Sequence, residues 1–128
     1  MNLQELANYL SDGGIVTQGK DLFIHNMPAK VDSGVLLRGK LTGTPINHEL
    51  PGYRRTGFQA VIRHTDYKEG FELAETVSSE LTFKGGDTVL GSIVVKHILP
   101  KHEPVVFPVS EGDFLEFSVN FDAVYIQN

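Results

Sequence analysis

The sequence predicts a single α+β domain over residues 1–128, with a mixed or mostly antiparallel sheet, one main helix packed across it and a short N-terminal helix. The length of 128 residues suits one domain with one hydrophobic core. Hydrophobic residues make up 41% of the chain and charged residues 21%, which is typical of a globular protein and not of a disordered one. The predicted elements follow the order α, β, β, long loop, β, α, β, β, β, which favours this fold class.

The first predicted element is a short helix at residues 2–11, ended by the glycines at 13 and 14. Strands are predicted at residues 21–26 and 34–39. Residues 41–56 contain two prolines and two glycines, which oppose regular structure and predict a long loop. A loop of this length in a small domain is usually functional or mobile. The apolar residues of the first helix recur at helical spacing and share one face: Leu3, Leu6, Ala7 and Leu10.

The middle of the chain predicts a strand at residues 58–65 followed by the main helix at residues 67–83. Both faces of the strand are partly apolar, which favours a central place in the sheet. Asp66 is predicted to cap the helix, with Glu69 completing a capping box. The glycines at 85 and 86 are predicted to close the helix. One stripe of the helix is predicted to face the core: Phe71, Ala74, Val77, Ser78 and Leu81.

The last third of the chain predicts strands. Residues 88–99 form a long β-branched run that is predicted to be one strand ended by Pro100. Residues 104–109 are bracketed by prolines, which favours an edge strand. Residues 114–126 alternate clearly, with apolar side chains on one face. Their other face is predicted to be solvated or to face another subunit: Glu116, Ser118, Asn120 and Asp122.

The residue types give little support for catalysis, for a cofactor or for a metal site. The absence of cysteine excludes disulfides, thiolate nucleophiles and zinc–thiolate sites. The best metal-ligand candidates are His97 and His102, but Pro100 between them breaks any regular element, which favours a solvated turn. No serine lies in a Gly-x-Ser-x-Gly elbow, and the glycine pairs lack the Lys-Ser or Lys-Thr of a phosphate loop. We therefore expect no catalytic residues, no metal, no cofactor and no enzyme activity.

The net charge of −5 and the pI of about 5.4 oppose a protein that grips nucleic-acid phosphates over its surface. They are compatible with a negative wall past which DNA slides, although a mild acidic charge also serves solubility alone. No signal peptide and no apolar run of about 20 residues is visible, so we expect no membrane partner and a place in the cytoplasm or in a particle assembled there.

The predicted loop ends in Leu50, Pro51, Gly52, Tyr53, Arg54 and Arg55, which are our candidate protein-interface residues. Tyr and Arg are enriched in interface cores. Two arginines on a loop of an acidic protein favour protein contact or a solvated surface over nucleic-acid readout. The alternative that Tyr53 folds back onto its own domain stays open at this point.

Three short motifs in about a quarter of the chain carry a resemblance to a known family, and the rest of the chain matches it in the order of elements. They are Pro51-Gly52-Tyr53, the strand Phe58-Gln59-x-x-x-Arg63, and the helix Tyr67-x-x-Gly70-x-x-x-Ala74 that runs to Leu81. The order and the residue pattern of these motifs resemble those of the minor capsid or tail terminator proteins of tailed bacteriophages.

The resemblance implies a structural protein of the virion that assembles in the host cytoplasm and resides at the tail neck. It implies a homohexameric ring that caps the tail tube, stops its polymerisation and joins it to a head connector or stopper protein. The implied partners are further copies of the chain, the tail tube protein and that connector, while DNA passes through the lumen without specific binding. Two alternatives stay open: another neck protein, such as a connector or stopper, and a small α+β enzyme or ligand-binding module, which needs a pocket with convergent polar groups.

Overall fold

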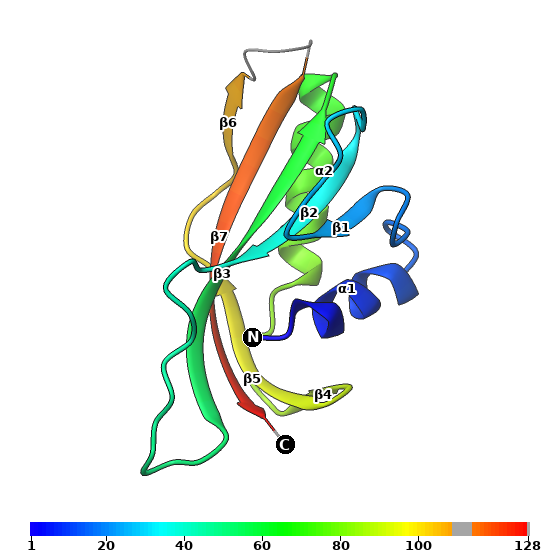
Figure 1. Cartoon of the computed structure of the whole chain (residues 1–128). Coiled ribbons are helices and arrows are strands. Elements are labelled where there is room, and N and C mark those ends of the chain that lie inside the picture. Colours follow the sequence, from blue (N-terminus) through cyan, green and yellow to red (C-terminus); the bar gives the residue numbers. More distant parts are fainter. Residues whose placement is uncertain (109–113, 128) are drawn as a thin grey trace.

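A curled mixed sheet carries both helices on one of its faces (Figure 1). The structure is a computed structural model and describes residues 1–108 and 114–127. Within these residues the strand order is β1-β2-β3-β7-β5-β4, and β6 pairs with β7 beside β5. Only β1 and β2 run parallel, so the expected α+β class with a mixed, mostly antiparallel sheet is confirmed. The strands are β1 (Leu22–Ile24), β2 (Gly34–Gly39), β3 (Tyr53–His64), β4 (Thr88–Leu90), β5 (Ile93–Pro100), β6 (Val105–Pro108) and β7 (Leu115–Gln127).

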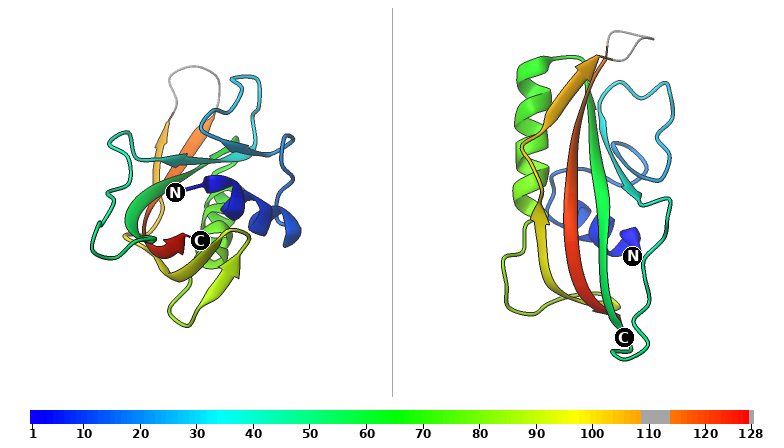
Figure 2. Two further views of the ribbon diagram at one scale, coloured as in Figure 1. Left: turned by 60° about the horizontal axis from the view of Figure 1, so that its bottom comes forward. Right: turned by 90° about the vertical axis from the view of Figure 1, so that its left-hand side faces the viewer.

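The longest pairing joins β3 and β7, which are antiparallel and stay in register from Tyr53 opposite Ile126 to His64 opposite Leu115. The other edge of β7 is shared by two strands, because β6 covers its first residues and β5 covers its last ones. In the right-hand view of Figure 2, helix α2 and the loop at residues 40–52 lie on opposite sides of this strand pair. The expected central place of the strand at residues 58–65 is therefore confirmed.

Helix α1 (Leu3–Asp12) forms as predicted and buries its apolar stripe against β1, β2 and β4. The side chain of Asn2 caps it by accepting a hydrogen bond from the backbone N–H of Gln4. Four residues of one face are buried, which confirms the periodicity seen in the sequence: Leu3, Leu6, Ala7 and Leu10.

Helix α2 (Tyr67–Glu80) begins as predicted, because Asp66 Oδ2 accepts a hydrogen bond of 2.8 Å from the N–H of Glu69. The reciprocal half of the expected capping box is absent from the described hydrogen bonds, since the N–H of Asp66 donates to His64 Nδ1 at 3.0 Å instead. Ala74 and Val77 are buried, as expected for the core-facing stripe.

The helix ends earlier than predicted. Phe83 does not continue the helix, because its N–H and C=O form two hydrogen bonds of 2.8 and 2.9 Å with Ile98 of β5. The prediction that Gly85 and Gly86 close the helix was therefore wrong, and these glycines lie in the connection to β4. The pairing with Ile98 provides the backbone hydrogen bonds of Phe83 that a further helical turn would otherwise provide.

The expected single strand at residues 88–99 is a hairpin of β4 and β5. Leu90 pairs directly with Ile93, and Gly91 between them has φ of +58°, a conformation that a β-branched residue does not tolerate. The sequence did not predict this turn, because the β-branched residues on both sides of it are typical of one continuous strand. The predicted edge strand at residues 104–109 is confirmed for Val105–Pro108, while Val109 lies outside the described residues.

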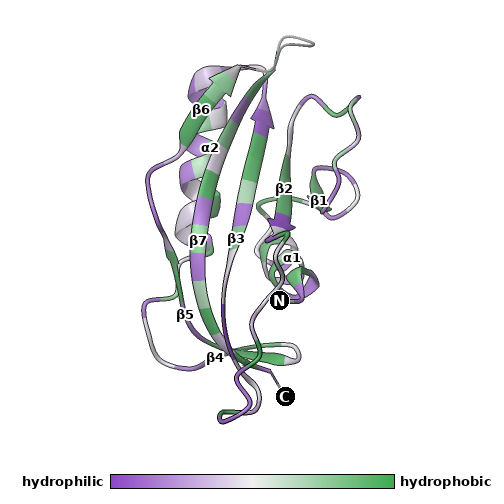
Figure 3. Cartoon of the chain, turned by 60° about the vertical axis from the view of Figure 1, so that its left-hand side comes forward, coloured by the Kyte–Doolittle hydropathy of each residue, from purple (hydrophilic) through white to green (hydrophobic). Residues whose placement is uncertain are grey.

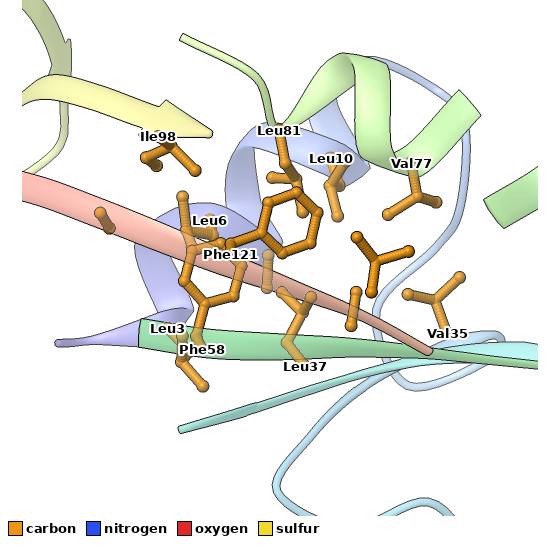
Figure 4. Packing of buried hydrophobic residues seen from close by; sticks show 14 of the residues in the cluster. Leu3, Leu6, Leu10, Val35, Leu37, Phe58, Val77, Leu81, Ile98 and Phe121 are labelled. Atoms are coloured by element: carbon orange, nitrogen blue, oxygen red, sulfur yellow. The ribbon is translucent and has the colours of Figure 1, made fainter. Parts of the chain in front are cut away.

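The core lies between the sheet and the two helices (Figure 4). Phe58 of β3 and Phe121 of β7 stack at its centre, with ring centroids 4.8 Å apart. Figure 3 shows the alternation of polar and apolar residues along β7 that places Phe121 inside. A smaller apolar cluster of Met27, Leu36 and Val61 lies on the opposite, outer face of the sheet. None of the helices in the described residues is both long and apolar enough to cross a bilayer.

Candidate functional site

The candidate interface residues mark the place where the loop joins β3. Leu50 is 55% exposed and Pro51 is exposed, whereas Gly52 and Tyr53 are half-buried. The loop ends at Gly52, so the predicted loop boundary at residue 56 was wrong. Residues 53–56 form a strand because they pair with β7, which follows far later in the chain.

Gly52 makes the turn that leads into β3. Its φ is +87°, and a Cβ at this position would lie 2.9 Å from the carbonyl oxygen of Gln127. The carbonyl of Gly52 accepts a hydrogen bond of 2.7 Å from Gln127, and Tyr53 donates one of 3.0 Å to the carbonyl of Leu50. The turn is thus fixed by glycine on both geometric and steric grounds.

The two arginines face opposite sides of the sheet, because neighbouring strand residues alternate. Arg55 points to the outer face and forms an ion pair with Asp122 at 3.1 Å, and its side chain remains 66% exposed. Arg54 points to the inner side and donates a hydrogen bond of 3.0 Å to the carbonyl of Tyr53. The expectation of two exposed arginines on one loop was therefore wrong, and only Arg55 is available to a partner on the outer face.

A hydroxyl network anchors the loop near its start. The amino group of Met1 donates to Thr44 Oγ1 at 3.1 Å, and Thr44 Oγ1 donates to Thr56 Oγ1 at 3.0 Å. Burial raises the pKa of the Tyr125 phenol beside this network, although a hydrogen bond with Thr44 and the charge of Arg54 act in the other direction. Sequence reasoning missed this network because Thr44 and Thr56 lie in different elements and follow no recognisable motif.

The loop carries exposed apolar side chains before and between its two anchor points. Leu41, Ile46 and Leu50 have more than half of their surface exposed, at 105%, 61% and 55%. The loop also covers a pocket of about 680 Å³, which is lined on the sheet side by Tyr53 and Arg55. Exposed apolar groups of this kind, rimmed by polar residues, are typical of a protein-contact surface.

Among the residues considered for metal or phosphate binding, His102 and Arg63 have structural partners, whereas Nδ1 of His97 is buried without a hydrogen-bond partner in the described residues. His97 lies in β5, so the expected solvated turn was wrong for this residue. His102 Nε2 accepts a hydrogen bond of 3.2 Å from the N–H of Asn120, and its Nδ1 lies 2.7 Å from the carbonyl of Glu103. Arg63 forms an ion pair with Glu116 at 3.2 Å. It also donates hydrogen bonds of 3.1 and 2.9 Å to the backbone carbonyls of Pro28 and Val31, which precede β2. No group of three His, Asp or Glu side chains within residues 1–108 and 114–127 could hold a metal ion.

A second feature was not seen in the sequence. A pocket of about 240 Å³ on the outer face of the sheet is lined by Arg38, Lys40 and Lys101. These residues come from β2, from the start of the loop and from the β5–β6 connection, so no local pattern could reveal that they meet. The outer face thus concentrates positive charge in a chain whose net charge is −5.

Comparisons with known proteins agree with this arrangement. A comparison with curated protein sequences finds no match. The fold is similar to that of a chain in a solved structure described as "Virion of native gene transfer agent (GTA) particle". The identity is 16% and the TM-score 0.66, over 96% of this chain and 90% of that chain. The family model described as "Bacteriophage tail terminator protein" matches residues 9–126, which is most of the sequence, and the chain therefore belongs to this family of structural phage tail proteins.

Proposed function

We propose that the chain is a tail terminator that forms a six-membered ring on the finished tail tube. The ring occupies the growing end, so the next tube subunit cannot add, and its opposite face receives the head connector or stopper protein. The observation that carries this proposal is the family match over residues 9–126, which spans helix α2 and nearly the whole of the described sheet.

The mechanism is steric and requires no reacting group. A head-to-tail ring uses two different surfaces of each subunit, and it closes when the rotation per subunit divides a full turn. The two ends of such a ring differ, so one end can cover the tube while the other meets a new partner. The acidic charge of the chain fits a lumen that DNA crosses without being held. The ring assembles in the host cytoplasm and ends up at the neck of the virion.

We further propose that the segment Leu50–Arg55 and the loop before it contact the tail tube or the neighbouring subunit. At this junction Leu50 exposes apolar surface and Arg55 exposes a charged side chain. The loop is anchored by Thr44 and Gly52, so it loses little conformational entropy when its exposed apolar residues bind a partner.

The first test is the mass of the purified chain in solution, measured by light scattering over a concentration series at physiological salt. A hexamer supports the ring. A strict monomer leaves the ring possible only by templated assembly, which is then tested by adding the chain to polymerising tail tube protein and measuring tube length. Wild-type chain that neither forms a ring nor limits tube length overturns the proposal and favours another neck protein.

The role of the loop is tested with the triple variant Leu41→Ser, Ile46→Ser and Leu50→Ser. We expect it to unfold at the same temperature as the wild type but to lose ring formation or tube capping. Val89→Ser is the matched control, because Val89 is 68% exposed on β4, at the edge of the sheet. A triple variant that assembles and caps like the wild type would show that the loop is not the contact.

A further inference from the structure

The outer face of the sheet carries a cluster of three cations, Arg38, Lys40 and Lys101. Arg38 lies opposite Gln59, and Gln59 lies opposite Asn120, so the residues on this row share one face. The N–H of Lys101 donates to the carbonyl of Asn120 at 2.8 Å, which places Lys101 at the end of the row.

Gly57 allows Lys40 to join this cluster. A Cβ at Gly57 would lie 2.9 Å from Lys40 Cε and 3.1 Å from the carbonyl oxygen of Phe121. The lysine side chain therefore crosses β3 directly over the glycine, and any larger residue would displace it.

The carboxylates on this face are already engaged with other arginines. Asp122 pairs with Arg55 at 3.1 Å, and Glu116 pairs with Arg63 at 3.2 Å. None of the salt bridges within residues 1–108 and 114–127 involves the three cations of the cluster. The cluster thus lies between two neutralised ion pairs and retains its positive charge.

Helix α2 carries the complementary charge on the opposite side of the molecule. Glu69, Glu72 and Glu80 are exposed and fall at i, i+3 and i+11, which places them on one stripe of the helix. Both helices lie on the inner face of the sheet, away from the cation cluster (Figure 1). Glu69 and Glu72 are like charges at i, i+3, a spacing that destabilises an isolated helix, so this part of the stripe gains from an external cationic partner. Glu69 Oε2 also lies 3.5 Å from Nε2 of His64 in the same chain.

We propose that the cation cluster of one copy docks on the acidic stripe of α2 of the next copy, and that this contact closes the ring. The inference rests on the proposed function, because it assigns the two faces that the head-to-tail ring requires. Opposite charges on opposite faces let the same contact repeat from subunit to subunit, whereas they oppose a face-to-face dimer.

The dimensions and surroundings of the two surfaces agree. The cluster spans three strand spacings from Arg38 to Lys101, about 14 Å. The stripe spans eleven helical residues, about 16 Å. Leu99, Val105 and Phe107 are 40%, 52% and 42% exposed and lie on or beside the outer face, where they supply apolar area. The charges then determine which surfaces of neighbouring subunits meet and how they align, and the apolar groups add buried apolar area to the contact.

The test uses two full-length charge-reversal variants. The cation-face variant carries Arg38→Glu, Lys40→Glu and Lys101→Glu, and the stripe variant carries Glu69→Lys, Glu72→Lys and Glu80→Lys. We expect each variant alone to need at least about a tenfold higher concentration for ring formation than the wild type, because like charges now meet. An equimolar mixture should assemble again. In an alternating ring the reversed cluster of one variant meets the reversed stripe of the other, and the two unreversed faces meet in the next contact, so every contact joins opposite charges. An alternating ring of this kind requires an even number of subunits, which six satisfies.

Lys20→Glu, Lys30→Glu and Lys84→Glu together form the control for the cation-face variant, since they change the net charge by the same amount and lie on exposed loops. Thermal unfolding verifies that every variant is folded. If the wild type is monomeric alone, the same set is compared by co-sedimentation with purified tail tubes. Variants that assemble singly like the wild type, or a mixture that fails to assemble, overturn the docking faces.

Three results distinguish a subunit contact from phosphate binding and from a failure of the proposed function. A cation-face variant that assembles normally but loses binding to a short duplex DNA at low salt shows that the cluster serves phosphate, and it overturns the subunit contact. A wild-type chain that forms no ring and caps no tube refutes the proposed function itself. If the wild type forms rings and both charge-reversal variants form them equally well, only the docking faces are refuted and the terminator proposal stays intact.

Discussion

Gly70 on α2 allows the helix to approach the sheet closely, and Gly70→Ala tests this directly. A Cβ at this position would collide with the Phe117 ring, whose Cζ would lie 2.9 Å away, and it would lie equally close to Cβ of His64. Phe117 is fully buried and its ring contacts the rings of Tyr67 and Phe71. Aromatic rings therefore border Phe117 on the side of the helix, and they oppose a shift of its ring.

The magnitude follows from two opposing effects. Alanine is favoured over glycine within a helix by about 1 kcal/mol. Inserting a methyl group into a filled core costs about 1–3 kcal/mol, and the upper end applies because two neighbours are approached at once. The net loss in the free energy of unfolding is therefore about 2 kcal/mol, equivalent to a decrease of about 8 °C in Tm for a domain of this size.

Urea unfolding followed by circular dichroism measures this loss. Gly13→Ala is the control, since its new Cβ would meet only backbone oxygens at 3.5 and 3.6 Å, and we expect a change within about 0.5 kcal/mol. Phe117→Leu should reduce the additional cost of Gly70→Ala, because a smaller side chain leaves room for the methyl group. A Gly70→Ala variant that is as stable as the wild type would refute the steric reasoning.

Three further predictions concern single side chains. Asp66→Ala should lower the free energy of unfolding by about 1 kcal/mol through loss of the α2 cap, whereas Asp66→Asn should retain most of it; equal losses would contradict a capping role. The raised pKa of Tyr125 means that the unfolded chain releases this proton first, so stability should decrease as the pH rises above about 10, and Tyr125→Phe should reduce the decrease in unfolding experiments between about pH 9 and 11. Gly52→Ala should cost about 1–2 kcal/mol because of its positive φ and should speed proteolysis within the loop, and unchanged cleavage would show that the turn does not restrain the loop.

The parts of the fold that could be predicted from sequence are those determined by local patterns. The stripe of α1, the Asp66 cap and the alternation in β7 each depend on residues close in the chain. The errors arose where a distant partner decides the structure. Phe83 leaves the helix because Ile98 pairs with it, and Tyr53 begins a strand because Ile126 lies opposite.

The candidate site shows the same division. Sequence reasoning found the junction at Leu50–Arg55 but placed both arginines on one surface, because it took the segment for a loop and a loop has no alternation of faces. Once residues 53–56 form a strand, Arg54 and Arg55 must separate. The cation cluster is assembled from three segments that only the strand order brings together, so no motif in the sequence could indicate it.

The long register between β3 and β7 also determines when the chain can fold. β3 ends at residue 64 and β7 begins at residue 115, so the central pairing cannot form until β7 has been synthesised, long after β3. Until then the edges of β3 and β5 are unpaired and open to association with other chains. A chain that is truncated before β7 therefore leaves the edges that β7 pairs with in β3, β5 and β6 exposed, and we expect it to associate with other chains and not to fold.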